Sequence, residues 1–434
     1  MDLSPDAVAV IGFVVLFALM LLRVPVGMAM GLVGVTGFGY LVGAQPALKM
    51  VGQTSMRIVT DYTFGVIPMF LLMGAFVSRS GMSRELFRAA NTFVGHLRGG
   101  LGIATIAACA GFAAISGSSV ATAATFSTVA YPEMRRFDYP QSFATGVIAA
   151  GGTLGAMFPP SIVLAVYGLI TQQDIGKLFI AGVLPGLLAV SMYMATIGII
   201  GRVRPHFLPA APRSSWAERW AAAREVWAPL ALFVFVIGGL YGGLFTPTEA
   251  GGMGAGGAFL ISLARRRLSR ADILESLLQA TRTAAAVFTV LIGAILFGYF
   301  LTVTQTPQNV TAFITGLGMG RYGVLAVIML MYLALGCLMD AMAMIILTVP
   351  IIFPVVTSLG FDPVWFGVII VMTVELGLIH PPVGMNVFVI KTVVKDVSFS
   401  TIFLGVIPFV LTDITRLVVL ILFPAIALWL PGRM

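Results

Sequence analysis

The sequence predicts an all-α protein that crosses a membrane many times and contains two repeats of inverted topology. Of its 434 residues, 59% are hydrophobic and only 10% are charged, whereas a soluble domain carries about 25% charged residues. Runs of about 20 apolar residues recur along the chain, the length needed to cross a hydrocarbon core about 30 Å thick. The placement of basic residues and a duplicated proline motif then arrange these runs into a topology.

The same composition argues against several other classes of protein. Cys109 and Cys337 both lie in apolar segments, so we expect neither a disulfide framework nor a cysteine-based metal site. No P-loop motif occurs, which argues against ATP as the direct energy source. The net charge of +8 lies in a few loops between apolar runs, so it indicates topology rather than nucleic-acid binding. The run at residues 7–22 lacks a cationic leader and a small-residue cleavage site, so we expect a retained helix.

Basic residues mark the loops that we expect to face the cytoplasm. They collect at Arg79 to Arg98, Arg135–Arg136, Arg202 to Arg224 and residues 265–270. The segment 101–131 lies between two of these loops, so both of its ends are cytoplasmic. Its two arms, about 12–14 residues each, reach only about 20 Å, which is too short to cross comfortably. We therefore expect a re-entrant hairpin with a polar tip.

The remaining apolar runs alternate across the membrane without misplacing a basic loop. Residues 322–356 form a second hairpin that starts from the outer face, and residues 141–171 and 364–394 cross in opposite directions, each with a break. The basic arm that follows the first repeat carries three tryptophans, which is typical of an interfacial amphipathic helix. The chain thus divides into N-terminal scaffold helices (1–62), a first repeat (63–200), the amphipathic arm with central scaffold helices (201–282) and a second repeat (283–434).

A motif with two adjacent prolines occurs twice, at a fixed offset of 222 residues. Leu154, Gly155, Pro159 and Pro160 correspond in this way to Leu376, Gly377, Pro381 and Pro382. Asp174 and Asp396 match at the same offset. Weak sequence symmetry combined with inverted topology is typical of secondary transporters.

Consecutive prolines inside an apolar segment predict that the helix breaks there. Proline lacks a backbone donor and excludes the preceding residue from helical geometry. Irregular backbone at that depth persists only where protein or a watery cavity satisfies it. The freed carbonyls suit a hard cation such as Na⁺, and the N-termini of the half-helices suit a carboxylate. A lone proline would indicate a simple kink, but the doubled and duplicated motif favours a binding site.

The candidate binding residues lie at the two hairpin tips and the two breaks. The predicted cation-binding residues are Ser116, Gly117, Ser118, Ser119, Gly155, Pro159, Gly336, Asp340, Gly377, Pro381, Gly384 and Asn386. The predicted substrate-binding residues are Ser119, Thr122, Ser161 and Asn386. Close helix packing is the alternative for the small residues at 116–119. Na⁺ is the only ion expected, with no transition metal and no other cofactor.

Charged residues inside apolar segments leave alternatives open. Asp340 at the second tip is either a direct ligand or a brace for backbone N–H groups, because a carboxylate within a membrane is costly and functional by default. Glu375, the repeat partner of Thr153, either ligates an ion or pairs with a structural donor. Asp413 and Arg416 stand three residues apart, which favours a structural ion pair.

Three stretches of the chain resemble the large membrane subunit of tripartite ATP-independent periplasmic (TRAP) transporters. They read "SGSSVATA" at 116–123, "GCLMDAMAMIILTVPI" at 336–351 and "VELGLIHPPVGMN" at 374–386. The resemblance extends over nearly the whole chain. It departs from the family pattern at His380, where the family often has threonine, so a side-chain ligand at this position is not expected.

The resemblance implies an elevator-type transporter of the bacterial inner membrane, with Na⁺-driven uptake of a small carboxylate and no enzymatic activity. With the charge map, it places the N-terminus in the periplasm. It also implies two partners that this chain does not encode, a small four-helix membrane subunit and a periplasmic substrate-binding protein. Lipid bilayer surrounds the chain, and no nucleic acid is involved.

Other functions fit the sequence less well. A self-sufficient dicarboxylate carrier or a Na⁺/H⁺ antiporter of the wider ion-transporter group is the main alternative, and it would work without a binding protein. An intramembrane enzyme is disfavoured because no HExxH, GxSxG or paired catalytic aspartate motif stands in the spans. A channel is disfavoured because broken helices in inverted repeats fit alternating access better.

Overall fold

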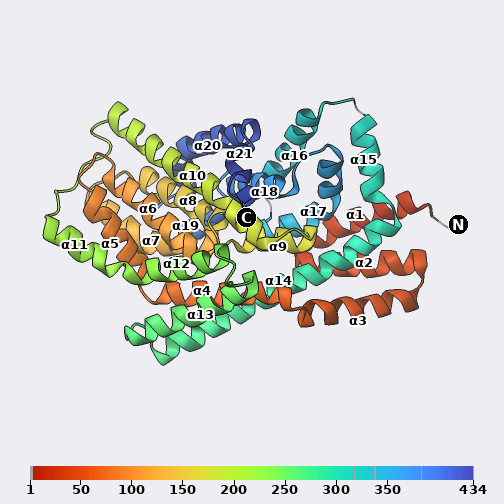
Figure 1. Cartoon of the computed structure of the whole chain (residues 1–434). Coiled ribbons are helices and arrows are strands. Elements are labelled where there is room, and N and C mark those ends of the chain that lie inside the picture. Colours follow the sequence, from red (N-terminus) through yellow and green to blue (C-terminus); the bar gives the residue numbers. More distant parts are fainter. Residues whose placement is uncertain (1–2, 317, 337–338, 383, 434) are drawn as a thin grey trace.

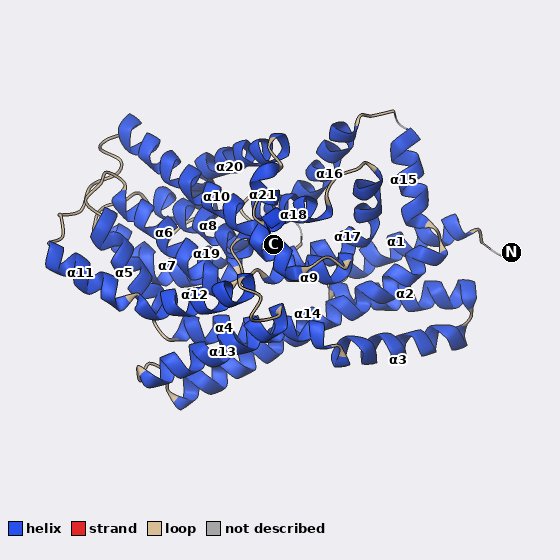
Figure 2. Cartoon of the chain, viewed as in Figure 1, coloured by secondary structure: helices blue, strands red, loops and turns tan. Residues whose placement is uncertain are grey.

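The computed structural model describes residues 3–316, 318–336, 339–382 and 384–433, and every regular element in that part of the chain is a helix (Figure 1, Figure 2). Cys337 and Val383, which belong to two of the motifs above, lie outside the described residues. Within the described residues, six helices are long and apolar enough to cross a membrane, or seven if one bent pair is counted as a single span. The prediction of an all-α polytopic membrane protein is confirmed.

Helices from the N-terminal and central parts of the chain pack together along one side of the molecule (Figure 1). They are α1 (Pro5–Leu21), α2 (Val26–Val42), α3 (Ala44–Thr60), α4 (Val66–Arg79), α12 (Trp227–Tyr241), α13 (Pro247–Ala264) and α14 (Arg270–Val303), with the short η1 (Tyr62–Gly65) before α4. Small residues allow this packing, since a Cβ built on Gly27 of α2 would lie only 2.6 Å from the Cα of Val290 in α14.

The first repeat consists of a helical hairpin and a broken helix. The hairpin is α6 (Gly100–Ser116) and α7 (Ser119–Arg136), the broken helix is α8 (Gln141–Met157) and α9 (Ile162–Thr171), and α10 (Ile175–Val203) follows. The break falls at Pro159 and Pro160, as the doubled proline predicts. The hairpin arms have 17 and 18 residues, longer than expected, because both helices continue beyond the apolar core of the segment.

The second repeat follows the same plan. Its hairpin is α16 (Arg321–Gly336) and α17 (Ala341–Ser358), its broken helix is α18 (Pro363–Gly377) and α19 (Met385–Val393), and α20 (Phe399–Leu422), α21 (Ala425–Leu428) and η2 (Pro431–Arg433) complete the chain. The two hairpins lie at opposite ends of the molecule (Figure 1). This arrangement agrees with the predicted inverted repeats, while the boundaries drawn at residues 62, 200 and 282 stay predictions.

Three segments differ from the expectation. The basic stretch from Arg79 to Arg98, expected as a loop, contains the helix α5 (Met82–Val94). Helix α14 begins at Arg270, well before the expected start at residue 283, and α15 (Thr306–Gly316) was not predicted. In α5 the cause is an amphipathic pattern, since Met82 and Phe87 are buried while Arg84 is exposed.

The tryptophan-bearing arm forms a short capped helix, α11 (Trp216–Glu225). Ser215 and Glu218 form a capping box at its start, and the hydrogen bonds from the backbone and side chain of Ser215 hold the pKa of the Glu218 carboxyl below its usual range. Trp216 and Trp220 are exposed, and Arg219 lies 5.0 Å from the ring centre of Trp216. Exposed indoles beside arginines are typical of an interfacial helix.

Candidate ion and substrate site

The two hairpin tips and the two helix breaks meet at one central cavity of about 410 Å³. Its polar and tip-forming wall residues are Ser116, Gly117, Ser118, Ser119, Asp340 and Ala341, and α4 and α14 contribute Ser78, Gln279 and Thr283. Residues that flank the breaks also reach it, namely Ile162 after the first break and Leu378 and Met385 around the second. The size suits a small organic molecule.

The first hairpin tip is a two-residue turn between helices. Gly117 ends α6 with φ +62°, a conformation that glycine adopts without strain. Ser118 caps α7, since its Oγ accepts a hydrogen bond from the N–H of Ala121 at 3.3 Å. The buried Thr122 donates its hydroxyl to the carbonyl of Ser118 at 2.8 Å. Thr122, predicted to bind substrate, therefore supports the turn and does not line the cavity.

This tip packs directly on the first break. A Cβ built on Gly117 would lie 2.1 Å from the carbonyl oxygen of Pro160, and one built on Gly155 would lie 2.5 Å from the backbone of Ser118. Ser161 caps α9, because its Oγ accepts from the N–H of Leu164 at 3.1 Å. Gly155, Pro159 and Ser161 thus form the layer behind the cavity wall and hold its backbone in place.

The second tip repeats this capping geometry with a carboxylate. Oδ1 of Asp340 accepts hydrogen bonds from the N–H groups of Met342 at 3.0 Å and Ala343 at 3.2 Å. Asp340 and Ser118 occupy equivalent positions, each as the N-cap of the second hairpin arm. Of the two alternatives for Asp340, the bracing contact is therefore present, and its side chain also reaches the cavity.

The second break contains the most unusual polar group of the site. Asn386 is completely buried, and neither its Oδ1 nor its Nδ2 has a hydrogen-bond partner in the part of the chain that the structure describes. A Cβ built on Gly152 would lie 3.1 Å from Nδ2 of Asn386 and 3.4 Å from the carbonyl oxygen of Ser119. Since buried polar groups are normally satisfied, this amide fits a bound ion or water beside the first tip.

The glycines of the second break have separate structural roles. Gly336 at the end of α16 and Gly377 at the end of α18 touch, since a Cβ on either would lie 2.8 Å from the Cα of the other. Gly384 starts α19 with φ +56°. Unlike the buried Pro159, Pro381 is exposed. None of these five predicted residues lines the central cavity.

Glu375 connects the two repeats. It is 1% exposed, and the Oγ of Ser119 lies 2.8 Å from each of its carboxylate oxygens. The contact joins the end of α18 to the start of α7, residues 256 positions apart in the sequence. Of the two alternatives for Glu375, the structure contains the structural pairing, with a hydroxyl donor that the sequence did not reveal.

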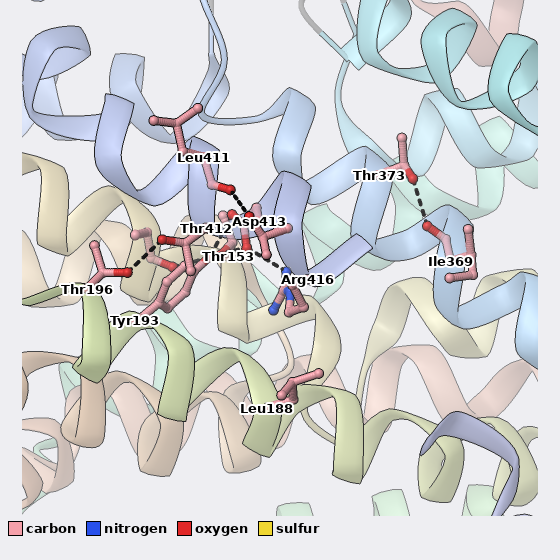
Figure 3. Close-up of polar contacts among 12 residues, drawn as sticks. Thr153, Leu188, Tyr193, Thr196, Ile369, Thr373, Leu411, Thr412, Asp413 and Arg416 are labelled. Atoms are coloured by element: carbon pink, nitrogen blue, oxygen red, sulfur yellow. Dashed lines mark hydrogen bonds and ion pairs between the residues drawn. The ribbon is translucent and has the colours of Figure 1, made fainter. Parts of the chain in front are cut away.

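A second buried network holds the position equivalent to Glu375 in the first repeat. Thr153 lies 3.1 Å from the hydroxyl of Tyr193, which donates to the Asp413 carboxylate at 2.7 Å and 2.8 Å (Figure 3). Arg416 then pairs with Asp413 at 2.9 Å, and both are almost completely buried. The expected ion pair is present. Tyr193 was missed, because nothing in its apolar segment marks it as a partner of α20.

The site presents side-chain oxygens and helix N-termini rather than a cluster of metal-binding side chains. In the described residues, no group of three or more His, Cys, Asp or Glu side chains comes together. Of the predicted residues, Ser116 to Ser119 and Asp340 line the cavity, and the others lie outside its wall. Which of them ligates an ion or a substrate remains a prediction.

Comparison with known proteins agrees with this geometry. Residues 13–426 match the family described as the tripartite ATP-independent periplasmic transporter, DctM component. The C4-dicarboxylate TRAP transporter large permease protein DctM of Pseudomonas aeruginosa is 41% identical over 372 residues, which are 86% of this chain and 86% of that protein. The isethionate TRAP transporter permease protein DctMQ of Oleidesulfovibrio alaskensis is 33% identical over 96% of this chain and 65% of its own length.

A solved structure supports the fold independently. The YdaH transporter of Alcanivorax borkumensis, whose structure is described as having an unusual topology, superposes with a TM-score of 0.53 over 89% of this chain and 88% of that chain, at 13% sequence identity. An identity this low supports the fold alone. The family match and the permease relatives together settle the family. The chain belongs to the DctM component family of tripartite ATP-independent periplasmic transporters and is a multi-pass membrane permease.

Proposed function

We propose that this chain is the large permease of a Na⁺-coupled importer that takes up a small organic anion delivered by a periplasmic binding protein. The observation that carries the proposal is the central cavity, where both capped hairpin tips and both helix breaks converge. Broken helices at a repeat interface are the usual place for coupling ions and substrate in secondary transporters. The relatives described above are named for C4-dicarboxylates and isethionate, so a C4-dicarboxylate is the first substrate to test.

The proposed Na⁺ sites lie beside the two tips. At the first, the buried amide of Asn386 and the carbonyl of Ser119 lie close to Gly152. Each supplies an oxygen, and the amide of Asn386 has no hydrogen-bond partner among the described residues. At the second, Asp340 supplies a carboxylate at the wall of the central cavity. The substrate would occupy the cavity between the tips. Of the four residues predicted to bind substrate, Ser119 is the one that lines this cavity. Thr122 and Ser161 would act only through the backbone they support.

The proposed assembly includes a small membrane subunit. The chain covers 65% of the DctMQ relative, and the remaining part of that relative is where a fused small subunit would lie. In this assembly the helices α1 to α3, α12 and α13 would belong to the static scaffold. The two repeats would move against it in an elevator-type cycle, in a bacterial inner membrane with the N-terminus periplasmic.

Uptake into proteoliposomes tests the coupling ion and the need for a binding protein. We expect the complete three-component system to accumulate labelled succinate in Na⁺ buffer and not in choline buffer. Each net positive charge that enters at about 100 mV contributes about 2.3 kcal/mol, which supports a concentration ratio of roughly 50-fold. Equal uptake in both buffers would overturn Na⁺ coupling. Full uptake without the binding protein would favour the self-sufficient carrier instead.

Cysteine labelling tests the inverted orientation. We expect Ser142→Cys and Ser358→Cys, in a background without Cys109 and Cys337, to react with an impermeant maleimide from opposite sides of the membrane. The two positions lie at the start of α8 and the end of α17. Labelling of both from the periplasmic side would contradict the proposed topology.

A further inference from the structure

A second cavity adjoins the central one. It measures about 510 Å³ and shares two wall residues, Ser78 and Ala124, with the central cavity. Its walls come from α4 and α5 and from α7 and α19. Across it, the hydroxyls of Ser78 and Thr125 approach to 3.4 Å. We call this cavity the release vestibule.

The chemistry of the release vestibule is one-sided. Its walls carry two arginines and four hydroxyls, and none of the described residues that line it is Asp or Glu: Ser78, Arg79, Ser83, Arg84, Thr125 and Thr128. A cleft that is lined by one sign of charge and has low-dielectric walls concentrates the opposite ion. Glu275 and Asp272 offset the charge of Arg79, so Arg84 is the group through which the vestibule favours anions over cations.

The two arginines are not equivalent. Arg79 is already engaged, since its guanidinium lies 2.5 Å from Glu275 and 4.0 Å from Asp272 of α14. Arg84 is exposed, and the structure records no ion pair for it within the described residues. One turn further along α5, Arg88 pairs with Glu225 at 3.1 Å and does not line the vestibule. Arg84 is thus the guanidinium whose donors are available to a passing anion.

We propose that the release vestibule is the cytoplasmic exit of the substrate and that Arg84 is its transient carboxylate ligand. The proposal rests on the proposed function, because it needs an anionic substrate and a cytoplasmic α5. A guanidinium matches the planar fork of a carboxylate, and hydroxyls at Ser78, Thr125 and Thr128 replace part of its hydration shell along the path. Because Arg84 is exposed to water, its ion pair with the substrate carboxylate is weak, and the substrate can dissociate from it quickly.

The first test measures the electrostatic potential of the vestibule and needs no substrate. A Thr128→Cys reporter, in a background without Cys109 and Cys337, is labelled in the complete transporter with an anionic and a cationic methanethiosulfonate. We expect Arg84→Gln to lower the ratio of anionic to cationic labelling rates about three- to tenfold at low salt. Arg84→Lys should keep the ratio, and Arg88→Gln should change it less than twofold. An unchanged ratio in Arg84→Gln, or equal changes in both glutamine variants, would overturn the proposal.

The second test follows substrate from the cytoplasmic side. In exchange experiments with labelled succinate, Arg84→Gln should raise the half-saturating internal concentration about fivefold or more, while the half-saturating external concentration stays within twofold. Arg88→Gln serves as the folded control with the same loss of charge. If wild-type protein does not exchange succinate at all, the substrate assignment fails and the labelling ratio still decides the vestibule. If Arg84→Gln changes both sides equally, Arg84 has no special part in release.

Discussion

The two repeats share a backbone plan but differ in how tightly the plan is packed. In each repeat, an N-cap residue precedes the second hairpin arm: Ser118 in the first and Asp340 in the second. In the first repeat, Gly117 contacts the backbone of Pro160, and the break is buried. In the second, the prolines at the break are exposed, and so is Asp340. The duplicated motif therefore determines the path of the backbone in both repeats, whereas the surrounding side chains determine how exposed each helix break is.

The same contrast appears one turn before each break. Thr153 belongs to a buried network that joins Tyr193 of the first repeat to Asp413 and Arg416 of the second, between α10 and α20. Its equivalent, Glu375, instead bonds to Ser119 in the other repeat. Both positions therefore connect the repeats: the first through an ion-pair network between two long helices, and the second through a hydroxyl at the hairpin tip. Variants at these positions should therefore separate stability from transport.

The largest effect on stability should come from the charged pair of the core. We expect Asp413→Asn to lower the free energy of unfolding by about 3–5 kcal/mol, because Arg416 then remains buried without a counter-charge. Thr412→Val, one residue before Asp413, removes the hydroxyl contacts to Thr196 of α10 and to the carbonyl of Pro408, and it should cost about 1 kcal/mol. Melting curves in detergent measure both. A similar small loss in the two variants would show that the ion pair contributes little.

The sequence predicted those features that depend on local rules. Proline chemistry located both breaks, polar stretches between short apolar arms located both tips, and i,i+3 spacing identified Asp413 with Arg416. It did not predict the partners of Glu375 and Tyr193, because a contact between residues 256 or 220 positions apart depends on tertiary placement.

The missed helix α5 has a different cause. Its three charged residues hid the amphipathic period of Met82, Leu86 and Phe87, which the sequence did contain. The amphipathic pattern was present in the sequence, but the charged residues of the segment led to the prediction of a loop.

Close packing at the first tip should give the next largest effect. Gly117→Ala places a Cβ against the carbonyl of Pro160 and keeps a φ of +62°, so we expect a loss of about 3 kcal/mol of stability together with loss of uptake. Gly81→Ala is the matched control, since Gly81 has φ +81° but no atom within 4 Å of its Cβ position. It should lose only about 1 kcal/mol. Equal losses would mean that backbone strain, and not docking of the tip, limits the first repeat.

The link between the repeats should have an intermediate effect. We expect Ser119→Ala and Glu375→Gln each to weaken uptake and to show a coupling energy of about 1.5–3 kcal/mol in a double-mutant cycle of stability. Ser116→Ala, at a hydroxyl that only approaches Thr122 at 3.4 Å, is the control and should show no coupling to Glu375. If the losses of stability in Ser119→Ala and Glu375→Gln simply add in the double variant, the hydrogen bond between the two residues does not stabilise the protein.

The smallest effect on stability, and the most informative one on transport, should come from the second tip. Asparagine caps helices as well as aspartate does, so Asp340→Asn keeps the bonds to Met342 and Ala343 and removes only the charge. If Asp340 also binds Na⁺, this variant should melt like wild type and need about 10- to 100-fold more Na⁺ for half-maximal uptake, the effect of losing one charge-assisted ligand.

Asp340→Ala and Ser118→Ala complete the comparison, since each removes a cap at an equivalent position at a cost of about 1 kcal/mol. Na⁺ titrations of uptake beside melting curves distinguish the two roles of Asp340. Normal Na⁺ dependence in Asp340→Asn, with a lowered melting temperature only in Asp340→Ala, would make the carboxylate a brace. The two tips would then be equivalent in function as well as in position, and the cation ligands would have to come from backbone carbonyls and Asn386.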